Sequence, residues 1–263
     1  NKESESAGSD AGSVKSSSKK KAVELQVFAA NSLEKALPEV QELYTDQTGT
    51  TFADTQFKAS GDLVEQMKAG AAVDVLITAS KGTMDDAETA ELVDTDTRED
   101  MFVNDLVIIR AEGSDAKVEA IADVANLDGK IAIGDAKTVP AGKYANQALA
   151  SVGLYTGTEG DDGEYAPEIA DKVALADKVG TAAAYVSTGD CVAGFVYSSD
   201  IYRYDGIEEA FVCPEDSHKP IVYPGAVAES SEHADEAKAF IDFCLSNKKA
   251  QKIWAKYGFE LSE

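Results

Sequence analysis

Apolar stretches of strand length alternate with amphipathic helical patterns between residues 23 and 92. Predicted strands occupy residues 23–30, 50–60 and 73–80, and predicted helices follow at 33–49, 62–71 and 83–92. Pro38 lies inside the first helix, where proline is tolerated only near a helix start, and Gly49 is the expected C-cap. A strand–helix repeat of this kind predicts a parallel sheet covered by helices, so the fold class is α/β.

The same alternation begins again near residue 104 and once more near residue 214. Predicted strands lie at 104–112, 130–136, 191–200, 204–216 and 220–230, and predicted helices at 143–154, 179–190, 233–247 and 248–259. We therefore expect two α/β lobes. Residues 22–104 and 215–263 would form lobe I, and residues 105–214 an inserted lobe II. Two crossings between lobes make a hinge with a ligand cleft between them. Two sequential lobes are the alternative that the pattern leaves open.

Four short turns that carry serine or glycine stand at the predicted starts of helices. They read AANSL at 29–33, KASGDL at 58–63, TVPAGKYA at 138–145 and DKVGTAAAY at 177–185. The first N–H groups of a helix have no partner within it, and the helix dipole adds partial positive charge there. Four such starts, with a tyrosine at a strand end, predict an oxyanion site built without Lys or Arg. Any one of these turns alone would be an ordinary helix cap.

The chain is strongly acidic, with a net charge of −24 over 263 residues. A surface of this sign repels nucleic acid and anionic membranes, so neither is an expected partner. No apolar stretch reaches the roughly 18 residues of a membrane span. Residues 1–21 are rich in Ser and Lys and carry no periodicity, which predicts a disordered tether. This segment resembles the tether that follows the lipidated cysteine of a surface lipoprotein; a plain flexible terminus is the alternative.

The cysteine and histidine spacings point to neither a metal centre nor a catalytic site. Cys191, Cys213 and Cys244 lack CxxC spacing. Cys244 lies on an apolar helical face and is expected to be a buried thiol, whereas Cys191 and Cys213 either pair or are both free. His218 and His233 have no partner at metal-ligand spacing. The chain also lacks GxSxG, Walker and HExxH motifs, so we do not expect an enzyme.

Several segments in order give the chain a family resemblance. They are VFAANSL, FKASGDLVEQMKAGAAVDVLITAS, GDAKTVPAGKYANQAL, VAGFVYSSD, PEDSHKPIVYPGAV and KIWAKYGFEL, which are spread over nearly the whole of residues 23–261. The chain resembles the molybdate-binding proteins of ABC importers. This resemblance implies a type II periplasmic-binding-protein fold and a protein that captures molybdate or tungstate and delivers it to a membrane permease. Molybdenum or tungsten would enter only as the oxyanion, with no direct protein ligand to the metal and no other cofactor.

The resemblance also implies which residues hold the anion. Hydroxyl groups would come from Ser32, Ser60 and Tyr197, and backbone N–H groups from Ala141 and Val179. Without the resemblance, the two serines would be interpreted as N-caps and the tyrosine as a core residue. Two departures stand out. Asn31 replaces an alanine that is commoner in the family, and the sequence Ala59-Ser60-Gly61 replaces a run of serines, which leaves one hydroxyl absent at Gly61.

The same resemblance implies a monomer at the cell surface or in the periplasm. The acidic face is a candidate surface for the permease. A receptor for another tetrahedral oxyanion, sulfate or phosphate, is the alternative on the same fold. Asp190, Asp200 and Glu215 are interpreted as solvated residues or local caps, and Trp254 and Phe259 as core residues.

Overall fold

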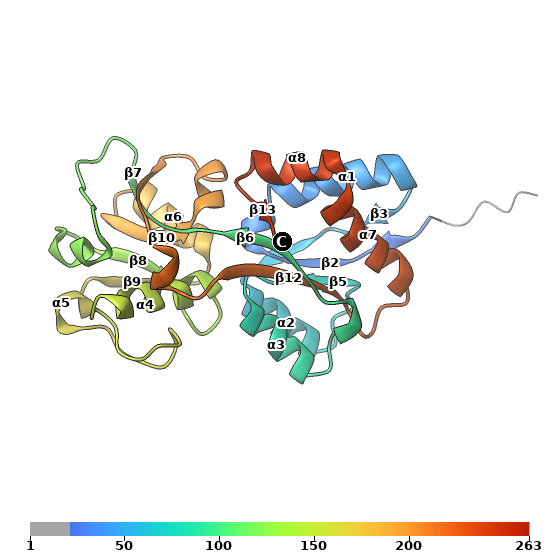
Figure 1. The fold of residues 1–263 in the computed structure, drawn as a ribbon, viewed down its shortest axis with the longest axis horizontal. Coiled ribbons are helices and arrows are strands. Elements are labelled where there is room, and N and C mark those ends of the chain that lie inside the picture. Colours follow the sequence, from blue (N-terminus) through green and yellow to red (C-terminus); the bar gives the residue numbers. More distant parts are fainter. Residues whose placement is uncertain (1–21, 263) are drawn as a thin grey trace, which may run out of the picture.

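The computed structural model describes residues 22–262 and divides them between two lobes, each built around its own sheet (Figure 1). The predicted tether at residues 1–21 lies outside the described residues. Within residues 22–262, the model contains no helix long and apolar enough to cross a membrane.

Lobe I is built on a six-stranded sheet with the strand order β13-β6-β12-β5-β2-β4. Its strands are β2 (Val27–Ala30), β4 (Gln56–Lys58), β5 (Val75–Ile77), β6 (Glu99–Asn104), β12 (Ile221–Val227) and β13 (Glu260–Leu261). Strands β4, β2 and β5 are parallel, and β12, β6 and β13 extend the sheet with antiparallel pairs. A separate parallel pair joins β1 (Glu24–Leu25) to β3 (Thr51–Phe52).

Helices cover both faces of this sheet, because its central strands are apolar on both sides. One face carries α1 (Ala36–Thr48), α7 (Ala234–Ser246) and α8 (Lys248–Lys256), and the other carries α2 (Ser60–Lys68) and α3 (Lys81–Thr89) (Figure 1). Successive residues of β2 accordingly belong to different cores. Val27 and Ala29 pack in the core that includes α1, and Phe28 packs with Leu63 and Met84.

Lobe II is built on a five-stranded sheet with the order β11-β7-β10-β8-β9. Its strands are β7 (Leu106–Ala111), β8 (Ile131–Gly134), β9 (Val173–Ala176), β10 (Ala193–Tyr197) and β11 (Ile207–Val212). Its helices are α4 (Pro140–Ser151), α5 (Pro167–Ala170) and α6 (Val179–Ser187). Short 3-10 segments are η1 (Asn31–Leu33), η2 (Thr95–Thr97), η3 (Ile121–Asn126), η4 (Ser198–Tyr202) and η5 (Glu215–Ser217).

The chain passes between the sheets twice. The first crossing is at Asp105, between β6 and β7, and the second lies between β11 and β12. Two sheet-containing lobes with two crossings are the type II arrangement. On this strand assignment we retain the bounds 22–104 with 215–263, and 105–214, as a proposal for the two units.

Several local predictions are confirmed and others are wrong. Pro38 lies in the first turn of α1, and Gly49 ends that helix in a left-handed conformation. The single strand predicted at residues 50–60 is wrong, because β3 and β4 pair with different strands. The loop predicted at residues 156–172 contains the one-turn helix α5.

The predicted core residues near the C-terminus are confirmed. Trp254 is fully buried and Phe259 nearly so. All three cysteines are buried and free, so Cys191 and Cys213 do not form a disulfide bond. Burial of an uncharged thiol needs no partner, because a free cysteine behaves as a small apolar side chain.

Candidate functional site

A small cavity of about 20 Å³ lies between the two lobes. Lobe I lines it with residues that follow β2, β4 and β5, and lobe II lines it with the starts of α4 and α6 and the end of β10. The lining consists of Ala30, Asn31, Ser32, Lys58, Ala59, Ser60, Ala79, Val139, Pro140, Ala141, Val179 and Tyr197. The structure therefore brings all five residues predicted to bind an anion to one cavity, although they span 166 positions of the chain from Ser32 to Tyr197.

Each of the four predicted turns opens a helical segment beside this cavity. The segments are η1, α2, α4 and α6. The alternative interpretation of the two serines as N-caps does not hold, because the N-caps are Ala30 and Ala59 and neither serine caps through its side chain. Ser32 and Ser60 instead lie within the first turn, where their hydroxyl groups are free to make tertiary contacts.

The hydroxyl group of Ser32 meets a tyrosine from the far end of the chain. Its Oγ lies 2.7 Å from the hydroxyl oxygen of Tyr223, and the Asn104 amide donates to that same tyrosine oxygen at 3.5 Å. Burial raises the pKa of Tyr223, so its proton stays in place. When Tyr223 donates to Ser32, the serine proton is left to point into the cavity.

A backbone N–H group orients the Ser60 hydroxyl so that its proton also points toward the cavity. Its Oγ accepts the N–H of Ala79 at 2.9 Å, and the residue is 1% exposed. A hydroxyl group has one proton to give. Because the oxygen of Ser60 already accepts from Ala79, its O–H remains as a donor for the cavity.

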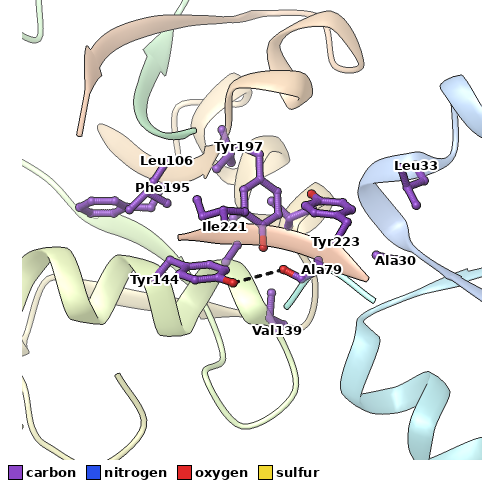
Figure 2. Packing of buried hydrophobic residues seen from close by; sticks show 14 of the residues in the cluster. Ala30, Leu33, Ala79, Leu106, Val139, Tyr144, Phe195, Tyr197, Ile221 and Tyr223 are labelled. Carbon is purple, nitrogen blue, oxygen red and sulfur yellow. Dashed lines mark hydrogen bonds between the residues drawn. The ribbon is translucent and has the colours of Figure 1, made fainter. Parts of the chain in front are cut away.

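Tyr197 ends β10 and carries a hydroxyl group that has no hydrogen-bond partner among residues 22–262. Its ring lies edge-on to Tyr144 and Tyr223, with ring centroids 6.4 and 5.8 Å away (Figure 2). Burial raises the pKa of Tyr197 well above its ordinary value, so the group is a protonated donor. A buried hydroxyl without a partner costs free energy, which a ligand oxygen at this place would recover.

Backbone N–H groups complete the donor set. Pro140 has no N–H, and the Gly142 N–H bonds to the carbonyl of Val139, so Ala141 supplies the remaining donor of the first turn of α4. Val179 is the first residue of α6, where an N–H has no acceptor within the helix. All these donors are neutral.

Two basic side chains lie near the cavity, and carboxylates neighbour one of them. Lys58 is one of the lining residues and makes no ion pair within the described part of the chain. Arg203 is buried behind the η1 turn beside Asp200. The prediction of a solvated Asp200 is wrong, since this residue is fully buried, although its carboxylate does accept the Tyr197 N–H at 2.9 Å as a local cap. No group of three metal-ligating side chains occurs in residues 22–262.

The two lobes are closed on each other around this cavity. The N–H of Gly61 in lobe I donates to the carbonyl of Thr138 in lobe II at 3.2 Å. Near it, the Tyr144 hydroxyl of lobe II donates to the carbonyl of Ala79 in lobe I at 3.5 Å (Figure 2). Backbone groups of the two lobes therefore come within hydrogen-bonding distance of each other.

We expect Gly61→Ala to weaken ligand binding about 5- to 30-fold, because overpacking of about 1–2 kcal/mol arises only when the lobes close. A Cβ at Gly61 would lie 3.0 Å from the Cα of Thr138. The melting midpoint of the ligand-free protein should change little, since the lobes can separate. Titration calorimetry and thermal melts measure the two effects.

Gly82→Ala is the matched control for this variant. Gly82 is the second residue of α3, as Gly61 is of α2, and a Cβ there would meet nothing within 4 Å. Unchanged affinity in both variants would show that the contact between Gly61 and Thr138 does not form in the liganded state.

The cavity lies between two α/β lobes, and hydrogen-bond donors from both lobes line it. The chain crosses between the lobes twice. This arrangement is that of a type II solute-binding protein. Comparison with known proteins agrees. Residues 25–260 match the family model described as bacterial extracellular solute-binding protein, and the chain belongs to this family.

Individual relatives are similar over most of their length. The chain is 33% identical to the molybdate-binding protein of Escherichia coli K12, over 90% of this chain and 89% of that protein. It is 30% identical to a protein of Bacillus subtilis 168 named as an ABC transporter substrate-binding lipoprotein, over 93% and 89% of the two chains. A solved structure from Clostridium difficile, described as the substrate-binding domain of a molybdenum ABC transporter, is 34% identical with a TM-score of 0.68, covering 92% of this chain and all of that one.

Sequence reasoning missed three residues around the site: Asn104, Tyr223 and Arg203. Tyr223 lies 191 positions from Ser32, in a strand whose apolar pattern gave no sign of a polar contact. A tyrosine inside a buried strand is itself a signal, because a buried Tyr hydroxyl usually finds a partner.

Proposed function

We propose that this protein captures molybdate or tungstate outside the cell membrane and delivers it to the permease of an ABC importer. One observation carries the proposal. Ser32, Ser60, Ala141, Val179 and Tyr197 all line the cavity between the lobes. Relatives named as molybdate-binding proteins, similar over most of their length, support the choice of anion.

The donor set suits a fully deprotonated tetrahedral dianion. Each hydrogen bond to a charged acceptor contributes about 1.5–3 kcal/mol, roughly twice a neutral pair. Several such bonds together offset the several kcal/mol that a buried ion loses on leaving water. The Ser60 oxygen accepts the Ala79 N–H, and Ser32 shares a hydrogen bond with the Tyr223 hydroxyl, so each serine is placed to donate its proton to the anion. A protonated oxyanion such as hydrogen phosphate would leave its O–H unpaired.

Molybdate and tungstate are then separated from sulfate by size. A cage of fixed N–H and O–H donors set for a larger tetrahedron leaves longer, weaker bonds to a smaller one. Sulfate or phosphate capture remains the alternative outcome of the experiment below. The donors come from both lobes, so the anion favours the closed arrangement, which the permease would recognise.

The remaining parts of the proposal concern setting and partners. The relative named as a lipoprotein supports a membrane-tethered protein at the cell surface, with residues 1–21 as the tether. We propose that it acts as a monomer without catalytic activity, without a cofactor and without a nucleic-acid partner. The net charge of −24 supports the last point.

A thermal melt with millimolar molybdate, tungstate, sulfate or phosphate tests the proposal. A ligand at about 100 times its dissociation constant stabilises the folded state by about 2.7 kcal/mol. For a chain of this size the melting midpoint is expected to rise by roughly 5–10 °C. We expect this rise with molybdate and tungstate, and none with sulfate or phosphate.

The other results would each correct the proposal differently. A rise with sulfate or phosphate alone would keep the fold and cavity and replace the substrate. No rise with any of the four would mean that the cavity does not bind tetrahedral oxyanions.

A further inference from the structure

Arg203 of lobe II is buried against the η1 turn of lobe I, although arginine is rarely buried without a role. Its side chain is 1% exposed. It follows η4, which leaves the end of β10, whereas η1 follows β2 of the other sheet. The guanidinium therefore reaches across the interface between the lobes.

The contacts of this guanidinium converge on one residue. Nη2 donates to Oδ1 of Asn31 at 2.7 Å, and Nη1 donates to the Asn31 backbone carbonyl. The Tyr204 hydroxyl, also from lobe II, donates to the same Oδ1 at 3.3 Å, and the guanidinium lies over the Tyr204 ring at 4.3 Å. A planar guanidinium that donates to both the side-chain oxygen and the backbone carbonyl of one residue fixes that residue in position and orientation.

Two carboxylates balance the buried charge, one from each lobe. Glu34 of lobe I lies 3.5 Å from the Arg203 Nε, and Asp200 of lobe II lies 3.6 Å from Nη1. Burial raises the pKa of Asp200 to about 6, and the guanidinium opposes that rise. Taking such charges out of water is costly, so the arrangement persists only when the lobes hold it together.

Asn31 connects these contacts to the cavity. It lines the cavity itself and immediately precedes Ser32, whereas Arg203 is not among the lining residues. The start of α6 adjoins the same group, because a Cβ on Gly180 would lie 3.3 Å from the Asn31 Oδ1. A shift of Asn31 would move the Ser32 turn relative to the rest of the donors.

We propose that Arg203 and Asn31 form an interlobe clasp that positions the Ser32 turn and shifts the ligand-free protein toward the closed arrangement, which the ligand then stabilises further. Arg203 is thus a positioning residue, which acts on the anion through Asn31. The ligand-binding part of this inference rests on the proposed function, but the closure of the ligand-free protein does not.

Small-angle X-ray scattering of the ligand-free protein tests the clasp directly. Arg203→Lys keeps the positive charge beside Asp200, so the fold should be retained. It loses the forked guanidinium that donates to Asn31. We expect a larger radius of gyration in this variant than in the parent protein. Arg110→Lys is the matched control, because among residues 22–262 Arg110 bonds only within lobe II, to Glu208 and to the Ala116 carbonyl, both at 2.8 Å. The control should scatter like the parent.

Asn31→Ala provides a second variant should Arg203→Lys fail to fold. It removes the side-chain acceptor without changing any charge, and it too should enlarge the ligand-free protein. If the variant that folds has the parent's radius of gyration, the clasp is overturned, whichever anion the protein binds.

Dissociation kinetics test the coupling to the site. Molybdate should leave Arg203→Lys about tenfold faster than the parent or Arg110→Lys, because most affinity changes within one binding site appear in the dissociation rate. An unchanged dissociation rate in a variant that has become less compact would overturn the positioning role. Failure of the parent protein to bind molybdate would instead contradict the proposed function and leave the scattering result to decide the clasp.

Discussion

Replacing Tyr197 with phenylalanine is expected to weaken oxyanion binding about 10- to 100-fold, the loss of one charge-assisted hydrogen bond. Without ligand, the Tyr197→Phe variant should be at least as stable as the parent protein. The Tyr197 hydroxyl is buried and has no partner in the described part of the chain, so its removal takes away a desolvation cost and little volume. Isothermal titration with molybdate and a melt without ligand measure the two opposite effects.

Tyr165→Phe is the matched control, with the opposite expected pattern. The Tyr165 hydroxyl donates to Oδ1 of Asn146 at 2.7 Å within lobe II, and neither residue lines the cavity. Its loss should lower stability by about 1 kcal/mol and leave binding unchanged. If Tyr197→Phe binds molybdate like the parent, Tyr197 is not a ligand donor and the site assignment is wrong at this position.

Gly142→Ala should be the most destabilising single change at the site, by about 3 kcal/mol or more. A Cβ at Gly142 would overlap the carbonyl oxygen of Gly134 and lie 3.2 Å from the Ala136 N–H. The first turn of α4 is pressed against the end of β8 at this point, and a methyl group forces the helix away. The melting midpoint should fall by roughly 6–12 °C.

The same displacement should reduce affinity, because Ala141 precedes Gly142 and moves with the helix start. Gly82→Ala serves as the control, since it adds the same methyl group near the start of a helix where nothing lies within 4 Å. It should leave stability unchanged or raise it by up to about 1 kcal/mol. A melting midpoint for Gly142→Ala equal to that of the parent would mean that α4 does not pack against β8 as described.

Local pattern was sufficient wherever one element's own chemistry decided its shape. Three of the four Ser- and Gly-bearing turns open α-helices as predicted, and Gly49 ends α1. The first turn opens only the three-residue segment η1, and α1 begins at Ala36. Local pattern failed where a strand's pairing partner lay far along the chain. Residues 50–60 form two short strands because each pairs with a different neighbour, and pairing depends on sheet order.

The candidate site divides in the same way. The five proposed donors could be assigned from the family resemblance of the turns and the strand end that carry them. Their orientation could not, since the serine hydroxyls are set by contacts with Tyr223 and the Ala79 N–H. Those partners are fixed by packing between strands and turns that are remote in sequence.

The α/β class and most helix starts followed from the sequence, because periodicity, capping and proline placement act over a few residues, and the expected oxyanion donors followed from its family resemblance. Only the tertiary structure decided that Asp200 is buried, that the cysteines do not pair, and that Arg203 reaches Asn31. Each of these depends on which surfaces meet when two lobes close. Burial and long-range contact are properties of the packed molecule, and no local pattern encodes them.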